Sequence, residues 1–210
     1  MSKLLNPLSE ELRPKTFDEL VLDKTIKDKL QKMYDSQNVM NMLFYGKPGS
    51  GKTSSSLIFC NSELFDCISI NGSLDTGIDN VRNKIKGFTS SCSLFSKPKL
   101  VLLDECDYLS KSTQGSLRGV IEESSTNCRF ILTCNELNKI QKPLQSRLLT
   151  ICFDMSQIEI RLELEKYKVR VIQFLKNKIV NLDESRVLRI IESNYPDYRT
   201  INQKLEFEFI

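Results

Sequence analysis

The chain has 210 residues, of which 40% are hydrophobic and 27% charged, the balance of a globular protein that can bury a core. Its formal net charge of +3 permits contact with nucleic acid but is too small to indicate it. No apolar run reaches the roughly 18 residues of a membrane span, and the N-terminus lacks a signal-like apolar core. We therefore expect a cytoplasmic protein without a membrane partner. The absence of histidine excludes histidine-based triads and metal sites.

The seven cysteines contain no C-x-x-C pair, and most lie inside apolar, strand-like runs. In such runs a thiol behaves as a small hydrophobic group. We therefore expect neither a zinc site nor a disulfide framework. The positions are Cys60, Cys67, Cys92, Cys106, Cys128, Cys134 and Cys152.

In chain order, a polar start and a proline-marked extended segment lead to a helix over 24–35, where apolar residues recur at helical spacing. Short apolar runs predict strands at 42–45, 66–71, 99–103, 128–134 and 150–153. Helical patterns follow the first strand and cover 77–91 and 112–124, and from 157 onward they predict only helices, over 157–179, 184–193 and 198–210. This alternation predicts an α/β fold with a five-stranded parallel sheet. We expect an α/β domain over 1–155 and a small all-helical domain over 156–210.

A glycine-rich segment directly after the first strand dominates the functional interpretation. It reads Gly46-Lys47-Pro48-Gly49-Ser50-Gly51-Lys52-Thr53, continues into Ser54, and fills the four fixed positions of the P-loop pattern. Glycines allow backbone N–H groups to approach a phosphate chain closely, and the N-terminus of the following helix adds its dipole. Lys52 would contact the β- and γ-phosphates, and the Thr53 hydroxyl would bind magnesium.

A second acidic motif follows the strand at 99–103, where Asp104 and Glu105 come directly after four apolar residues. Adjacent strand residues point to opposite sides, so the two carboxylates are predicted to have different tasks. Asp104 would orient the magnesium shell, and Glu105 would position or deprotonate the attacking water.

Two further polar residues are candidates for a part in the reaction. Asn135 follows the strand at 128–134 and would donate a hydrogen bond to the γ-phosphate or to the attacking water. The alternative is an asparagine in a turn that caps the strand and has no part in the reaction. Arg147 precedes the last strand, and phosphoryl transfer gains from an arginine that stabilises the developing negative charge.

The order and spacing of these motifs resemble those of AAA+ ATPases of the clamp-loader group. The likeness is closest to the large subunits of T-even-type bacteriophage clamp loaders, and the group includes replication factor C small subunits. Further matching segments are Leu12-Arg13-Pro14, Asn71-Gly72-Ser73, Cys106-Asp107, Lys142-Pro143-Leu144-Gln145-Ser146-Arg147 and Tyr195-Pro196-Asp197-Tyr198-Arg199. The resemblance implies an ATPase that uses ATP and Mg²⁺, located in the host cytoplasm if the protein is viral.

The resemblance also assigns roles to individual residues. Asn135 matches sensor 1, and Arg199 matches sensor 2, which touches the γ-phosphate of its own site. Arg147 matches an arginine that acts on ATP held by the neighbouring subunit, and Leu148 replaces the family's cysteine as a packing residue. The residues matching the segment that lines the adenine and ribose are Ser9, Glu10, Glu11, Leu12, Arg13 and Val21.

In the family, the helix after the acidic motif faces a DNA channel, and its glutamine and arginine couple DNA contact to the catalytic glutamate. Here Gln114 and Arg118 match them, although an i, i+4 pair of this kind is often a solvated face. Contacts to phosphates would recognise the shape of primer–template DNA rather than its sequence. The candidate DNA contacts are Arg82, Lys84, Lys86, Lys111, Ser112, Gln114 and Arg118.

The implied function is ATP-dependent loading of a sliding clamp onto primer–template DNA during replication, with hydrolysis triggered by DNA and clamp. The partners would be the clamp, the DNA and other loader subunits in a homo- or hetero-oligomeric ring. Two alternatives remain, namely a junction-helicase-like AAA+ motor and a non-hydrolysing ATP-binding scaffold subunit. The family continues into a helical collar, whereas this chain stops at Ile210, so we expect the collar to be a separate polypeptide or to be missing by truncation.

Overall fold

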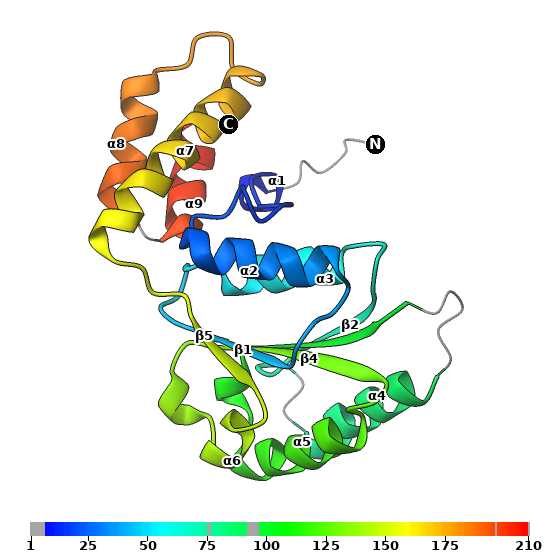
Figure 1. The fold of residues 1–210 in the computed structure, drawn as a ribbon. Helices are drawn as coiled ribbons and strands as arrows, with labels where there is room; N and C mark the ends of the chain where they lie inside the picture. Colours follow the sequence, from blue (N-terminus) through cyan, green and yellow to red (C-terminus); the bar gives the residue numbers. More distant parts are fainter. Residues whose placement is uncertain (1–6, 75–76, 92–96, 196, 210) are drawn as a thin grey trace, which may run out of the picture.

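The computed structural model describes residues 7–74, 77–91, 97–195 and 197–209. Its centre is a five-stranded, wholly parallel sheet with the strand order β2-β3-β4-β1-β5 (Figure 1). The strands are β1 (Met42–Tyr45), β2 (Asp66–Asn71), β3 (Lys99–Asp104), β4 (Cys128–Cys134) and β5 (Leu149–Cys152). The predicted α/β fold and five-stranded parallel sheet are confirmed.

Helices cover both faces of the sheet, with α2 and α3 on one face and α4, α5 and α6 on the other (Figure 1). In β3, Leu100 and Leu102 belong to the core beneath α2 and α3, while Val101 and Leu103 belong to the core against α4 and α5. A strand buried on both faces explains the unbroken apolar run in the sequence. The helices are α2 (Lys24–Asp35), α3 (Lys52–Cys60), α4 (Ile78–Ser90), α5 (Lys111–Glu123) and α6 (Lys142–Gln145).

A third core is formed by α7 (Gln157–Lys176), α8 (Glu184–Asn194) and α9 (Tyr198–Phe209). Leu8 and Leu12, from the start of the chain, complete this core, and both are at most 3% exposed. The short helix α1 (Leu8–Glu11) lies beside α9 (Figure 1), and the Leu8 N–H donates to Glu206 Oε1 at 3.3 Å. The C-terminal helices therefore share their core with the N-terminal segment.

Polar contacts attach α7 to the N-terminal segment and to α2. Lys27 on α2 and Glu163 on α7 form an ion pair, and both residues are less than a tenth exposed. Arg170 Nη2 donates to the Leu12 carbonyl at 2.9 Å and lies 3.3 Å from Glu19. These contacts fix how the helical part lies over the carboxyl edge of the sheet.

Single-turn elements are absent from the sequence prediction. These are α1, α6 and the 3₁₀ turns η1 (Cys106–Tyr108) and η2 (Leu137–Lys139). A helix of one turn offers no repeat of apolar residues, so periodicity cannot detect it. Among the described residues, no helix is both long and apolar enough to span a bilayer.

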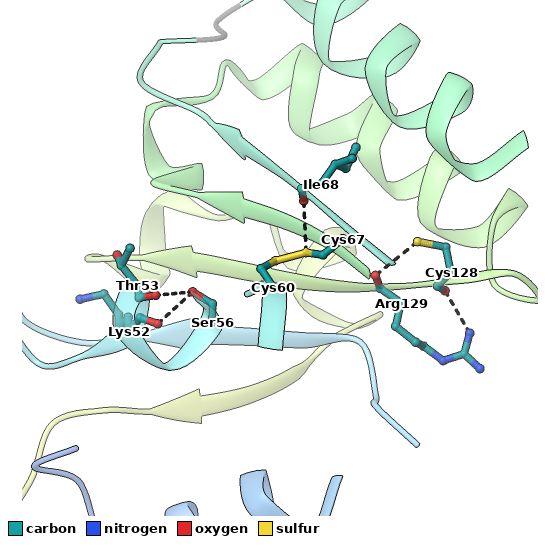
Figure 2. Close-up of a disulfide and its surroundings, with 8 residues drawn as sticks. All are labelled: Lys52, Thr53, Ser56, Cys60, Cys67, Ile68, Cys128 and Arg129. Atoms are coloured by element: carbon teal, nitrogen blue, oxygen red, sulfur yellow. Dashed lines mark hydrogen bonds between the residues drawn. A yellow bond between two sulfur atoms is a disulfide. The ribbon is translucent and has the colours of Figure 1, made fainter. Parts of the chain in front are cut away.

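The prediction about the cysteines is wrong for one pair, because Cys60 and Cys67 form a disulfide (Figure 2). Cys60 ends α3 and Cys67 lies in β2, and the short connection between them brings their Cα atoms to 5.1 Å. Apolar neighbours in the sequence could not reveal this return of the chain. Cys106, Cys128 and Cys134 are buried free thiols as predicted, Cys152 is a partly buried free thiol, and Cys92 lies outside the described residues.

Candidate nucleotide-binding site

A cavity of about 620 Å³ lies at the carboxyl ends of the strands, beneath the C-terminal helices. Its volume suits a small ligand. The predicted residues that line it are Ser9, Glu10, Leu12, Arg13, Val21, Pro48, Gly49, Gly51, Lys52, Thr53, Ser54, Asp104, Glu105, Asn135 and Arg199. Of the residues predicted to bind the nucleotide or to take part in hydrolysis, those outside its lining are Glu11, Gly46, Lys47, Ser50 and Arg147. The structure therefore gathers most of the predicted site in one place.

The P-loop connects β1 to α3 through an irregular turn. Gly49 and Gly51 have φ angles of 81° and 93°, in the region that a side chain rarely permits. Gly51 directly precedes α3, so the free N–H groups of the first helical turn open onto the cavity. This arrangement can bind the oxygens of a phosphate chain.

Lys52 begins α3 and is 6% exposed. Its ammonium donates to the carbonyls of Gly46 at 2.8 Å and Lys47 at 2.9 Å, two residues at the start of the same loop. Burial lowers the pKa of this ammonium, while nearby groups that include Cys134, Asp154 and Asp104 oppose the shift. The positive charge is thus held at the cavity wall by backbone oxygens.

A hydroxyl and carboxylate network connects the P-loop to β3 and β4. The Thr53 hydroxyl lies 3.0 and 3.1 Å from the two carboxylate oxygens of Asp104. Thr133, which is 2% exposed, donates to Asp104, and its oxygen accepts from the Glu105 N–H at 3.1 Å. Sequence reasoning missed Thr133, whose only signal is a polar residue near the end of an apolar strand.

This network also fits a magnesium ion. Mg²⁺ prefers hard oxygen ligands and commonly takes one or two protein oxygens together with phosphates and water. Thr53 and Asp104 supply such oxygens side by side. No group of three acidic or thiol side chains within metal-binding reach occurs in the described parts of the chain. A magnesium ion here would therefore depend on ligands from the nucleotide.

The direction of Glu105 arises from the backbone rather than from strand alternation. β3 ends at Asp104, and Glu105 follows with φ 57° and ψ 45°, a left-handed conformation that is uncommon without glycine. The prediction that treated Glu105 as a strand residue is therefore wrong. Gly72 packs against this turn, because its N–H donates to the Asp104 carbonyl at 2.8 Å and an added Cβ would lie 2.7 Å from the Glu105 carbonyl.

Helices α7 and α9 supply the wall that faces the strand ends. Arg199 is exposed and reaches the cavity lining from the start of α9. Beside it, the Tyr167 hydroxyl donates to Asn202 Oδ1 at 3.2 Å, and burial raises the pKa of Tyr167. Tyr167 and Asn202 both line the cavity but belong to no motif, so only the three-dimensional structure identifies them.

Arg147 lies outside the cavity, in the connection between α6 and β5. Its guanidinium pairs with Glu122 on α5 instead of pointing at the P-loop of its own chain. Leu148 is 8% exposed and belongs to the core against α4 and α5, as predicted for a packing residue.

The structure corrects the prediction for Gln114, which is 2% exposed and cannot contact DNA directly or form a solvated face. Its amide nitrogen donates to the carbonyls of Leu109 and Lys139 at 3.1 and 3.2 Å, and its oxygen accepts from the Gln141 N–H at 2.9 Å. Glutamine suits this position because its side chain is long enough to reach all three segments and carries both a hydrogen-bond donor and an acceptor. The exposed DNA-contact candidates are Arg82, Lys84, Lys111, Ser112 and Arg118, and Lys86 is partly exposed.

Comparison with known proteins agrees with this geometry. Residues 42–154 match the model of the ATPase family associated with various cellular activities (AAA). The chain is 35% identical over 197 residues to a replication factor C small subunit of Sulfolobus acidocaldarius, covering 91% of this chain and 59% of the relative. It is 36% identical over 203 residues to human replication factor C subunit 5, and the match covers 89% of this chain and 59% of the human protein. The chain thus spans about three fifths of the length of these relatives.

Among solved structures, the fold resembles the RuvB Holliday junction branch migration motor of Thermotoga maritima. The TM-score is 0.71 at 18% identity, covering 93% of this chain and 64% of that one. At this identity the likeness concerns the fold alone. Because the family model covers more than half of the chain and the cavity carries its nucleotide-binding motif, the chain belongs to the AAA family of ATPases.

Proposed function

We propose that this chain is the nucleotide-binding part of a clamp-loader subunit, which binds ATP with Mg²⁺ and hydrolyses it while a sliding clamp is loaded onto primer–template DNA. The observation that carries the proposal is the cavity that collects the P-loop, the Thr53–Asp104 pair, Glu105 and Arg199. The names of the relatives, replication factor C subunits, support the clamp-loader assignment.

In the proposed reaction, the N–H groups of the P-loop bind the phosphates and Lys52 leaves its carbonyl partners to neutralise their charge. Thr53 and Asp104 would hold Mg²⁺, which would neutralise charge on the phosphate chain. Glu105 orients the attacking water and accepts its proton, while Asn135 and Arg199 contact the γ-phosphate. Substituting Glu105 with glutamine keeps the shape but removes the base, so we expect Glu105→Gln to bind ATP without turnover.

The position of Arg147 outside its own cavity supports an action in trans on ATP held by a neighbouring subunit. Hydrolysis would then require assembly. A mixture of Arg147→Ala and Lys52→Ala subunits should recover part of the lost activity, because one interface retains both an intact P-loop and an intact arginine. A mixture that is as inactive as either variant alone would contradict this placement.

The proposed DNA surface consists of the exposed basic side chains on α4 and α5, which include Arg82, Lys111 and Arg118. Contacts of this kind are salt-dependent and carry no base code. The decisive experiment measures ATP hydrolysis with primer–template DNA alone, with a sliding clamp alone and with both together. We expect the highest hydrolysis rate with both. A hydrolysis rate that neither the DNA nor the clamp changes would contradict clamp loading.

The motif likeness to T-even-type phage loaders supports a phage origin and a host-cytoplasmic location as a finer proposal. Running the same assay with phage-type and with archaeal- or eukaryotic-type clamps tests it, because the cognate clamp should stimulate more strongly. The fold likeness to RuvB keeps a junction motor as the second candidate. A branched DNA junction that stimulates hydrolysis without any clamp would favour that candidate.

A further inference from the structure

The peptide group between Gly46 and Lys47 is held at both of its ends by charged side chains. Its carbonyl accepts from the Lys52 ammonium at 2.8 Å. Its N–H donates to the carboxylate of Asp154 at 2.8 Å, across 107 residues of sequence. Hydrogen bonds in such a chain polarise one another, so the carboxylate and the ammonium act together on one peptide plane. Asp154 has so far appeared only as one of the charges near Lys52, and no role in the site has been assigned to its hydrogen bond.

The backbone at Asp154 is fixed by the edge of the sheet. β5 pairs with β1 in parallel register, with Tyr45 opposite Cys152, and the Phe153 N–H donates to the Tyr45 carbonyl at 2.8 Å. Phe153 is 2% exposed, and its ring centroid lies 4.8 Å from that of Phe44. A buried aromatic anchor and a ladder hydrogen bond therefore hold the residue next to Asp154.

Gly46 and Asp154 also fit each other sterically. A Cβ on Gly46 would lie 3.0 Å from Asp154 Oδ1 and 3.3 Å from the Asp154 backbone nitrogen. Gly46 has φ 146°, which side chains rarely adopt, so space and backbone conformation both require glycine. The carboxylate lies directly against the start of the P-loop.

We propose that Asp154 is a positioning residue for the P-loop, whose carboxylate oxygen holds the Gly46–Lys47 peptide in the orientation that nucleotide binding needs. This inference rests on the proposed function. When Lys52 moves to the phosphates, the peptide loses its lysine contact, and the hydrogen bond to Asp154 remains to prevent it from rotating. The loop then stays ordered in the bound state, and less conformational entropy is lost on binding.

The test compares Asp154→Ala, which removes the acceptor, with Asp154→Asn, which keeps an oxygen at the same position but removes the charge. Asp28→Ala, an exposed carboxylate on α2, is the matched control. Calorimetry with Mg·ATP and Mg·ADP gives Kd for each protein. Because the hydrogen bond is solvent-exposed, we expect Asp154→Ala to raise Kd about three- to tenfold, with Asp154→Asn and Asp28→Ala within about twofold of the unsubstituted chain.

An Asp154→Ala variant that binds as tightly as the unsubstituted chain would overturn the proposal. An Asp154→Asn variant as weak as Asp154→Ala would also overturn it, since charge rather than the positioned oxygen would then matter. A second measurement does not depend on how the alanine variant folds. In the unsubstituted chain and in Asp154→Asn, the chemical shift of the Lys47 amide proton should lie downfield and change little with temperature. A large temperature coefficient in both proteins, as for an amide exposed to solvent, would contradict the hydrogen bond to residue 154.

The two proposals can fail separately. If the unsubstituted chain does not bind ATP, the proposed function fails whatever the Lys47 amide shows. If the unsubstituted chain binds ATP much more tightly than Lys52→Ala does, the nucleotide-binding part of the proposed function stands, and the comparison of the Asp154 variants decides the positioning role.

Discussion

Arg147 directs two nitrogens of its guanidinium at one oxygen of Glu122, with both Nε and Nη2 at 2.7 Å from Oε1. Arg118 approaches the same oxygen at 3.5 Å. One exposed carboxylate on α5 therefore holds the proposed trans-acting arginine and a proposed DNA-contact arginine together.

This arrangement predicts how Glu122 titrates. The hydrogen bond from Arg147 lowers its pKa below the usual 4.5, and Arg118 contributes less. Because the folded-state pKa is depressed, any stabilisation from the pair is present above pH 4.5 and is lost as pH falls through the lower value. Carbon-detected NMR of the Glu122 carboxyl should show its pKa rising in Arg147→Ala and rising less in Arg118→Ala. An unchanged pKa in Arg147→Ala would contradict the pairing.

Lys52→Ala should remove the buried ammonium at the cavity wall, whereas Lys47, the other lysine of the loop, is exposed and lies outside the lining. We expect the Kd for Mg·ATP to rise about 10- to 100-fold, as for the loss of hydrogen bonds to a charged group. Equilibrium binding of a fluorescent ATP analogue measures this. Lys29→Ala, an exposed lysine on α2, serves as the control and should bind normally. Similar affinities for the two variants would remove Lys52 from the site.

Thr133→Val keeps the shape of the side chain but removes the hydroxyl that joins Asp104 to the Glu105 N–H. Because the group is buried, the free energy of unfolding should fall by about 1–3 kcal/mol, measured by urea titration. Hydrolysis should fall as well, since both carboxylates lose a fixed neighbour. Thr133→Ser restores the hydroxyl and should recover most of the hydrolysis, whereas equal loss in both variants would point to packing alone.

The buried pair of Lys27 and Glu163 should matter for stability more than exposed pairs do. Among the described residues, Lys27→Met leaves Glu163 with Lys166 as its ionic partner, so we expect the free energy of unfolding to fall by about 2–3 kcal/mol. Lys29→Met on the exposed side of α2 is the control, with an expected change of less than about 0.5 kcal/mol. Equal effects of the two substitutions would mean that the buried pair contributes nothing specific.

The same pair predicts a pH dependence. Burial raises the pKa of Glu163, but hydrogen bonds from Lys166 and Lys27 outweigh it, so the net pKa lies below 4.5. The contribution of the pair is therefore complete above pH 4.5 and declines as pH falls through the folded-state value. Urea titrations at pH 7 and pH 3.5 should show a smaller difference between Lys27→Met and the unsubstituted chain at the lower pH.

The strands and most of the cavity were predictable because their signals are local. A buried strand reads as an apolar run, and the P-loop is a continuous motif with its helix attached. Residues that act through tertiary contacts were not predictable in this way. Thr133 looks like any β-forming residue, and the burial of Gln114 depends on Leu109, Lys139 and Gln141, which only the folded chain brings to it.

The left-handed turn at Glu105 shows a second kind of limit. Strand alternation predicted different directions for the two carboxylates. The direction of Glu105 instead comes from a left-handed backbone conformation, which no residue type in this segment indicates. The nearest signal was Gly72, thirty-three positions earlier, which has to be a glycine because the turn lies against it. Asp154 was missed for a related reason, since a single aspartate after a strand is an ordinary residue until its partner peptide is known.

Leu8 and Leu12 pack among α7, α8 and α9, so the order in which the chain is synthesised affects when this core can fold. The core beside the nucleotide cavity combines Leu8 and Leu12 with helices that follow about 150 to 200 residues later, so it can close only after α9 has left the exit tunnel. Contacts between residues that lie so far apart in the sequence form late and slowly during folding. The sheet and its P-loop can fold earlier, so a nascent chain would expose a formed phosphate cradle before it could retain a nucleotide.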